Sequence, residues 1–298
     1  MNILLSGGTG FIGQKLTEAL VSHGHKVYIL TRSPQKHAPT ESITYIGWLS
    51  PSYKPDAELP NIDAIVNLAG DSLFGYWTEE KKENLMDSRM KATESIINLI
   101  SNMENKPAVL INASAVGFYG TSTTETFTEH TTTPGKDFLS EITFQWEQTA
   151  LQAESLGVRT VLARLGVVLG HGGALPLMAL PFKLFVGGRI GSGEQWVSWV
   201  HIDDVIGMIE FAINNSDIKG AMNVTAPFPL RNKEFSKVLA KALNRPYWLP
   251  VPSFFIKNIL GEMSTLIIEG QCVIPEKAHD HRYTFIFPRI DKAFGDIF

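Results

Sequence analysis

The 298-residue sequence has little of what marks secreted, membrane-spanning or metal-binding proteins. Its single cysteine, Cys272, excludes an internal disulfide and suits a reducing compartment. The longest apolar stretch, Ala174 to Val186, contains two prolines and a lysine and is too short to cross a bilayer. The first apolar segment is broken by glycines and follows no basic leader, so no signal peptide is expected. No His, Cys, Asp or Glu residues have the spacing of a metal site. These absences predict a cytoplasmic protein without a metal.

Neither sign of charge dominates the sequence. There are 26 basic and 30 acidic residues, and the net charge of −4 provides no cationic footprint for nucleic acid or an anionic membrane. A hydrophobic content of 44% at this length is typical of a globular protein with one large or two smaller domains. We therefore expect a small-molecule ligand as partner, and neither nucleic acid nor a membrane.

The most informative segment is a glycine run close to the N-terminus. A short apolar segment typical of a strand precedes the run, and residues 14–21 follow it with apolar side chains at helical spacing. Gly7 would permit the tight turn, Gly10 the close approach of a pyrophosphate, and Gly13 the close packing of the helix on the sheet. The N–H groups at the start of that helix would face the phosphates. This order of strand, glycine turn and helix predicts a dinucleotide site.

Strand-like and helix-like segments alternate through the first two thirds of the chain, which is typical of a parallel sheet covered on both faces. We predict an α/β, Rossmann-type doubly wound fold with a smaller C-terminal lobe. The dinucleotide domain is expected over residues 1–220 and the lobe over 221–298, with 167–198 packed against the lobe. Strands are predicted at 26–30, 63–69, 108–114, 158–165 and 222–225, and helices at 79–102, 137–156 and 232–243.

The end of the second predicted strand indicates which dinucleotide binds. In these folds an acid at this point binds the ribose hydroxyls of NAD, whereas an arginine nearby pairs with the 2′-phosphate of NADP. Here the strand ends in Thr31, Arg32 and Ser33, without an acid. The guanidinium of Arg32 has a fork of donors that fits a phosphate, and Ser33 adds a hydroxyl. The sequence favours NADP(H), although Arg32 as a solvated loop residue is the alternative.

Together with the glycine run, several segments resemble the atypical and extended short-chain dehydrogenase/reductases, which form the NAD-dependent epimerase/dehydratase superfamily. Within it the chain is most similar to an epimerase-like group with a short C-terminal domain of unknown function, and the resemblance covers nearly the whole chain. The segments that carry the two likenesses are 7–13, 67–70, Ser114 with Tyr119-Gly120, 199–205, 88–89, 164–170, 187–193 and 270–275.

The resemblance implies that residues 67–70 line the adenosine and ribose side of the cofactor and that Arg89 contacts it. Relatives often dimerise through the two long helices, so the resemblance keeps a homodimer as one alternative for the oligomeric state. With the glycine run and the end of the second strand, the residues expected to bind NADP(H) are Gly7, Thr9, Gly10, Phe11, Ile12, Gly13, Thr31, Arg32, Ser33, Leu68, Ala69, Gly70 and Arg89.

Catalysis in the superfamily rests on a Tyr-x-x-x-Lys pair one helical turn apart, in which the lysine lowers the pKa of the tyrosine. The helix that should hold this pair has none; counted from Tyr119, the two positions fall near Leu139 and Thr143. Ser114 and Tyr119 remain as candidate catalytic residues, and a turn or packing role is the alternative for Tyr119. The same count places Ala115, rather than Ser114, at the usual serine position.

Other polar and aromatic residues are expected to have structural roles. Glu147 is expected on the surface of its helix, and the resemblance gives His201 a part in holding the two lobes together. Asp203 and Asp204 are expected at the start of a helix, where carboxylates suit the helix dipole. Three tryptophans could line a pocket, but packing is the expected role of such large aromatics: Trp77, Trp196 and Trp199.

Two functions stay open at this point. One is an NADP(H)-dependent oxidoreductase or epimerase-like enzyme that acts on a small molecule with a non-standard proton donor, or with none. The other is a non-catalytic NADP(H)-binding regulatory protein, as some relatives are described as cell-division inhibitors. The missing pair favours the second, whereas the glycine-rich, aromatic segment 170–199, which could close over a ligand, favours the first.

Overall fold

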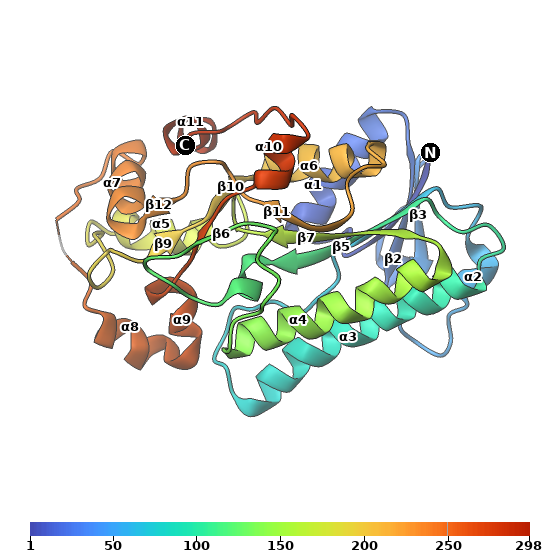
Figure 1. The fold of residues 1–298 in the computed structure, drawn as a ribbon, viewed down its shortest axis with the longest axis horizontal. Coiled ribbons are helices and arrows are strands. Elements are labelled where there is room, and N and C mark those ends of the chain that lie inside the picture. Colours follow the sequence, from blue (N-terminus) through green and yellow to red (C-terminus); the bar gives the residue numbers. More distant parts are fainter. Residues whose placement is uncertain (249) are drawn as a thin grey trace.

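The computed structural model describes residues 1–248 and 250–298 and contains one large parallel sheet (Figure 1). Its strand order is β11-β7-β5-β4-β1-β2-β3. From β1 the chain first adds β2 and β3 on one side and then returns to add β4, β5, β7 and β11 on the other. In open α/β sheets, ligands bind beside the carboxyl ends of the strands where the strand order reverses in this way, here between β1 and β4. The predicted Rossmann-type fold is confirmed. The strands are β1 (Asn2–Ser6), β2 (Lys26–Thr31), β3 (Ile43–Gly47), β4 (Ala64–Asn67), β5 (Val109–Ala115), β7 (Arg159–Leu165) and β11 (Gly220–Val224).

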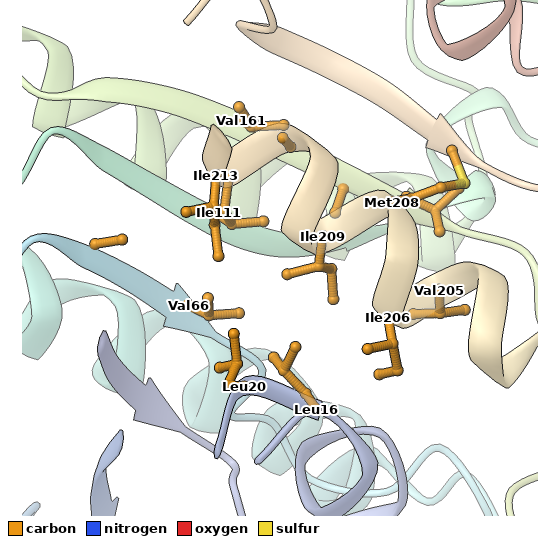
Figure 2. Close-up of a cluster of buried hydrophobic side chains, with 14 of the residues drawn as sticks. Leu16, Leu20, Val66, Ile111, Val161, Val205, Ile206, Met208, Ile209 and Ile213 are labelled. Carbon is orange, nitrogen blue, oxygen red and sulfur yellow. The ribbon is translucent and has the colours of Figure 1, made fainter. Parts of the chain in front are cut away.

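Helices cover both faces of the sheet (Figure 1). On one face lie α1 (Phe11–Ser22) and α6 (Ile202–Asn214), and on the other α3 (Glu79–Asn102) and α4 (Phe138–Leu151). Figure 2 shows α1 and α6 side chains packed on the sheet, among them Leu16 and Ile209. Because side chains alternate along a strand, Leu5 joins this core, whereas Leu4 joins the core beneath α3. Strands buried on both faces explain the near-continuous apolar runs in the sequence.

The C-terminal lobe follows the sheet and has its own buried cluster, which α5, α7 and α11 share. Residues 167–198 contribute to it through α5 and through β9, which pairs with β12. The edge strand β11 belongs to the large sheet and extends to Val224, past the domain boundary predicted at 220. The elements are β8 (Val167–Leu169), α5 (Leu175–Lys183), β9 (Trp196–Val197), β10 (Trp199–His201), β12 (Leu230–Arg231), α7 (Asn232–Ala242), α8 (Ser253–Leu260), η4 (Gly261–Ser264), α9 (Thr265–Ile268), β13 (Cys272–Val273), α10 (Glu276–Asp280) and α11 (Ile290–Ile297).

Short elements connect the larger ones. The 24-residue helix α3 coincides with the predicted helix, and α4 continues into a 3₁₀ turn that completes the predicted helix at 156. Two elements were not predicted: β3, of which only the last two residues are buried, and α5, which contains an internal proline. No helix of the described residues is both long and apolar enough to cross a membrane. The remaining short elements are η1 (Pro34–Lys36), α2 (Pro55–Glu58), η2 (Val116–Tyr119), β6 (Thr126–Phe127) and η3 (Gln152–Leu156).

Candidate functional site

The glycine turn between β1 and α1 has three positions with different constraints. Gly7 has φ +71°, and a Cβ added there would lie 2.7 Å from the Leu68 carbonyl carbon. A Cβ at Gly13 would collide with the Gly7 carbonyl oxygen. At Gly10 an added Cβ would meet only that same oxygen, at 3.3 Å, so this backbone faces open space. No side chain caps α1, so its first N–H groups are available to an anion.

A second group of glycines, in the loop after β8, packs against the first residue of α1. A Cβ at Gly170, Gly172 or Gly173 would lie 2.6–3.2 Å from the ring of Phe11, the first residue of α1. The loop after β8 therefore packs its bare backbone on this ring. These glycines are conspicuous in the sequence, but their contact with the turn could not be predicted, because only the tertiary structure brings residue 170 to residue 11.

The end of β2 lies beside the glycine turn, because β1 and β2 are hydrogen-bonded neighbours with Ser6 opposite Leu30. Arg32 follows directly and is exposed, and no carboxylate in the described part of the chain forms an ion pair with it. The Ser33 N–H donates to the Thr31 hydroxyl oxygen at 3.3 Å. The Arg32 guanidinium therefore lies at the carboxyl ends of the strands, where no acid in the described residues competes with a ligand for it.

Leu68, Ala69 and Gly70 follow β4, on the other side of β1. Arg89 of α3 packs against Gly70, where an added Cβ would be 3.2 Å from its Cζ. The Arg89 guanidinium lies 5.2 Å from the Trp146 ring and donates to the Leu85 carbonyl oxygen at 3.0 Å. Burial lowers the pKa of Arg89. The structure therefore brings the residues predicted to bind the cofactor to one edge of the sheet.

Unlike residues 68–70, which follow β4, Asn67 is the last residue of β4 and is fully buried. Its fully buried side chain accepts a hydrogen bond from the Ser6 hydroxyl (2.5 Å) and donates to Asn112 Oδ1 (2.6 Å) and to the Thr93 hydroxyl (3.0 Å). Ser6, Asn67 and Asn112 are in register across β1, β4 and β5. The resemblance implied that Asn67 lines the cofactor, but its side chain instead fixes the ends of three strands beneath it.

A second polar row crosses the sheet two residues further along. Ser114, Arg164 and Asn223 are in register on β5, β7 and β11. Arg164 forms a two-point ion pair with Glu147 of α4, with Nε–Oε1 and Nη2–Oε2 distances of 2.8 Å. Ser114 donates its hydroxyl proton to Glu147 Oε1 at 2.5 Å. Burial acts to lower the pKa of Arg164, but hydrogen bonds and charge from Glu147 outweigh it and raise that pKa.

The expectation that Glu147 lies on the helix surface is wrong. Its side chain is 3% exposed, because α4 turns the face with Leu139, Thr143 and Glu147 toward the sheet. These residues are four apart and therefore lie on one face of a helix. A buried carboxylate needs a partner. The signal that could have found it is Arg164, a charged residue that directly follows the buried apolar residues 161–163 of β7.

Tyr119 joins the same network from η2. Its hydroxyl accepts a hydrogen bond from Arg164 Nη1 at 2.9 Å and donates to Asn223 Oδ1 at 2.7 Å. Burial raises the pKa of Tyr119, and the nearby Arg164 works in the opposite direction without cancelling the effect. The phenol is therefore neutral at neutral pH. The two predicted catalytic residues are joined through Glu147 and Arg164, and they are only 2% and 4% exposed.

Comparison with known proteins identifies the family to which the chain belongs. Residues 3–225 match the NAD dependent epimerase/dehydratase family. The chain belongs to this family. Residues 251–297 match a domain of unknown function, DUF1731. The chain is 48% identical over 297 residues to the epimerase family protein YfhF of Bacillus subtilis and 41% identical over 295 residues to the epimerase family protein SSP1921 of Staphylococcus saprophyticus. Both alignments span 99–100% of this chain and 98% of the relative.

Solved structures show the same likeness. The human epimerase family protein SDR39U1, solved with NADPH, is 33% identical, and the match has a TM-score of 0.87 and covers 100% of this chain and 99% of the human chain. A nucleoside-diphosphate sugar epimerase from Corynebacterium glutamicum is 29% identical with a TM-score of 0.79, and the match covers 58% of its chain. The whole length of this epimerase-family chain thus has a counterpart in SDR39U1.

The positions where the resemblance expects the catalytic tyrosine and lysine face the loop after β5. A Cβ at Gly117 would lie 3.4 Å from Leu139 Cβ and 3.8 Å from Thr143 Oγ1. The Thr143 hydroxyl donates to the Leu139 carbonyl oxygen at 2.6 Å. This side of the site therefore presents an alkyl group and a hydroxyl whose proton is already bonded.

His201, Asp203 and Asp296 lie close together between the start of α6 and the helix α11. His201 Nδ1 accepts the Asp203 N–H at 3.2 Å, so the neutral ring carries its proton on Nε2, 3.3 Å from Asp296 Oδ2. In this tautomer a metal ion would have to displace the Nε2 proton, although the three residues lie close enough together to reach one. Asp296 is on α11, so His201 joins the start of α6 to the C-terminal lobe, in keeping with its expected role.

Asp203 and Asp204 lie in the first turn of α6, as expected, but Asp204 does more than suit the helix dipole. Its fully buried carboxylate accepts the N–H groups of Ile286 and Phe287, both at 2.8 Å. Trp199 is fully buried and Trp77 nearly so, which agrees with packing roles.

Proposed function

We propose that the chain binds NADP(H) and is an epimerase- or oxidoreductase-like protein that acts on a small molecule without the usual tyrosine and lysine. The observation that carries the cofactor assignment is the exposed, unpaired Arg32 at the end of β2, with Ser33 beside it and no acid. Guanidinium groups bind phosphate through two parallel hydrogen bonds, so Arg32 fits the 2′-phosphate that distinguishes NADP from NAD. The NADPH in the structure of SDR39U1 supports the same choice.

The residues present fit a dinucleotide. The open backbone at Gly10 and the uncapped start of α1 would take the pyrophosphate. Residues 68–70 and Arg89 would line the adenosine and ribose side. When bound, NADP(H) would supply the hydride chemistry. The chain's own contribution would be to bind the cofactor and orient the ligand beside Gly117.

The side chains near that position are poorly suited to acid–base catalysis, because their protons are already hydrogen-bonded. The Ser114 proton is donated to Glu147, and the Tyr119 proton to Asn223. The raised pKa of Tyr119 also opposes its loss of a proton near neutral pH. Either residue would have to break a buried hydrogen bond before it could exchange a proton with a ligand. We therefore expect any turnover to draw its proton from water or from the substrate.

The second candidate function is a non-catalytic NADP(H)-binding regulatory protein. The observation that favours it is the closed network of Ser114 and Tyr119, opposite an alkyl side chain at Leu139. Such a site can hold a cofactor without moving protons. The cell-division inhibitor role of some relatives would belong to this class.

The cofactor assignment is tested by titrating the purified protein with NADPH and NADH and following energy transfer from tryptophan to nicotinamide. Arg32→Ala should weaken NADPH binding about tenfold or more and leave NADH binding nearly unchanged, since a hydrogen-bonded charged pair contributes about 1.5–3 kcal/mol. Lys36→Ala, in the exposed turn that follows, is the matched control and should change neither value. Tighter binding of NADH than of NADPH by the unmodified protein would contradict the assignment.

Turnover is tested separately, by following the oxidation of NADPH in the presence of a panel of carbonyl compounds. Turnover that survives Tyr119→Phe and Ser114→Ala supports an enzyme that uses neither side chain as its proton donor. NADPH binding without turnover on any compound of the panel supports the regulatory alternative.

A further inference from the structure

The helices α5, α7 and α8 lie at one end of the molecule (Figure 1). Large apolar side chains of α5, of α8 and of the segments that follow α5 and precede α8 are exposed. Soluble proteins rarely leave so many apolar groups together in water, and such patches mark interaction surfaces. We call this surface the α5–α8 patch. Its members are each 48–65% exposed: Leu177, Leu180, Leu184, Phe185, Val186, Trp248, Phe254, Phe255 and Ile259.

The helix α8 contributes most clearly to the patch. None of its eight residues is buried, although most of them are apolar. Phe254 and Phe255 stack on each other with ring centroids 4.1 Å apart, and both remain exposed. Burial against this chain therefore does not account for the composition of α8.

Direct contacts join the two segments of the patch. Trp248 Nε1 donates to the Phe185 carbonyl oxygen at 3.0 Å, and the Arg245 guanidinium lies 4.7 Å from the Phe185 ring. The Val251 N–H donates to the Arg189 carbonyl oxygen at 2.8 Å. Phe185 has φ +64°, an uncommon conformation for a bulky residue, and its ring still points to solvent.

Cations predominate in the segments that form the patch, although Glu194, Glu234 and Glu262 border them. Residues 171–193 and 235–261 contain six cationic residues and no carboxylate, whereas the remainder of the chain has a net charge of −10. In the described part of the chain none of the six lies within ion-pair distance of an acid, unlike Lys82 and Lys233, which do. The six cations are Lys183, Arg189, Lys237, Lys241, Arg245 and Lys257.

We propose that the α5–α8 patch binds the surface of an anionic lipid bilayer. Exposed aromatic and aliphatic side chains enter the boundary between headgroups and acyl chains, and unpaired cations beside them attract anionic headgroups. Lysine and arginine can lay their alkyl stems on the apolar surface and keep the charge at the headgroups. A tryptophan at the rim, such as Trp248, suits this boundary as well.

A second copy of the chain fits the patch less well. A two-fold interface would bring the same cations against each other, with no carboxylate in either segment to compensate them. The proposal also departs from the expectation of no membrane contact, which was based on net charge. Net charge averages over the whole molecule, whereas a bilayer meets only the surface that faces it.

The test is flotation of the full-length protein with phosphatidylcholine vesicles that contain phosphatidylglycerol, compared with vesicles of phosphatidylcholine alone. We expect binding to the anionic vesicles that weakens with added salt. Lys183→Glu with Lys257→Glu should lower binding at least about 25-fold, because each cation near an anionic surface contributes about fivefold. Phe254→Ser with Trp248→Ser should lower it too, without changing Tm much, since neither side chain is buried.

The matched control is Lys26→Glu with Lys91→Glu, which makes the same change in net charge at exposed lysines outside the patch. It should leave vesicle binding within about twofold of the unmodified protein. No binding to anionic vesicles would overturn the proposal, as would an equal loss in the control pair. A dimer in light scattering that Phe254→Ser dissociates would also overturn it and assign the patch to a second copy.

Discussion

Replacing Glu147 or Arg164 singly should destabilise the protein strongly. Both side chains are at most 4% exposed, and two N–O contacts of 2.8 Å join them. Removing one partner leaves the other as an unpaired charge in a desolvated site, which costs about 3–5 kcal/mol. We expect this loss in the free energy of unfolding for Glu147→Leu and for Arg164→Met.

Replacing both residues together should cost much less than the two single changes added. Two apolar side chains of similar volume leave no stranded charge, and such replacements of buried pairs are often neutral. What remains is the loss of one hydrogen bond each at Ser114 and Tyr119, about 1 kcal/mol apiece. The double variant should therefore lose about 2 kcal/mol and be more stable than either single variant.

The assay is urea unfolding of the four proteins near neutral pH, followed by tryptophan fluorescence. Lys91→Met, which breaks an exposed ion pair with Asp87, is the control and should cost less than about 0.5 kcal/mol. Single variants that cost less than about 1 kcal/mol, or a double variant that costs the sum of both, would refute the reasoning. Either result would mean that Glu147 and Arg164 are not energetically coupled.

Two further predictions concern the glycine turn and His201. Gly10→Ala should fold and weaken NADPH binding at least about tenfold, since its Cβ would occupy the open space without a collision, whereas Gly13→Ala should lower Tm. Titration and thermal unfolding check both against Gly295→Ala, an open helical position, and unchanged NADPH binding by Gly10→Ala would contradict the assignment of that space. Burial lowers the pKa of His201 below its unfolded value of about 6.5, although the charges of Asp203 and Asp296 oppose the shift. The folded state therefore favours neutral His201. This contribution to stability is complete above about pH 6.5 and is lost as the pH falls below it. The stability difference between the unmodified protein and His201→Asn in urea should therefore shrink from about pH 7.5 to 5, and a difference that grows would contradict this sign.

Local pattern was enough to predict the elements whose signals lie within the sequence. The spacing of apolar residues over 79–102 predicted α3, and Asp137, which accepts the Ser140 N–H, marks the start of α4. The glycine turn was predictable because a strand, a turn and a helix that follow one another along the chain meet in space by necessity. β3 was missed because only its last two residues are buried, so it lacks the continuous apolar run of the inner strands. α5 was missed because it carries prolines, which usually end helices.

By itself, the sequence determined the parallel sheet, the glycine turn and an arginine where an acid would select NAD. Only the tertiary structure decided that Glu147 is buried against Arg164, that Asn67 points into the sheet, and that Phe185 and Trp248, both exposed, meet on one surface. The physical reason is the distance along the chain over which each kind of interaction acts. Periodicity and turn chemistry act between residues a few positions apart, whereas a buried charge or a surface patch depends on partners 17 to more than 60 positions away.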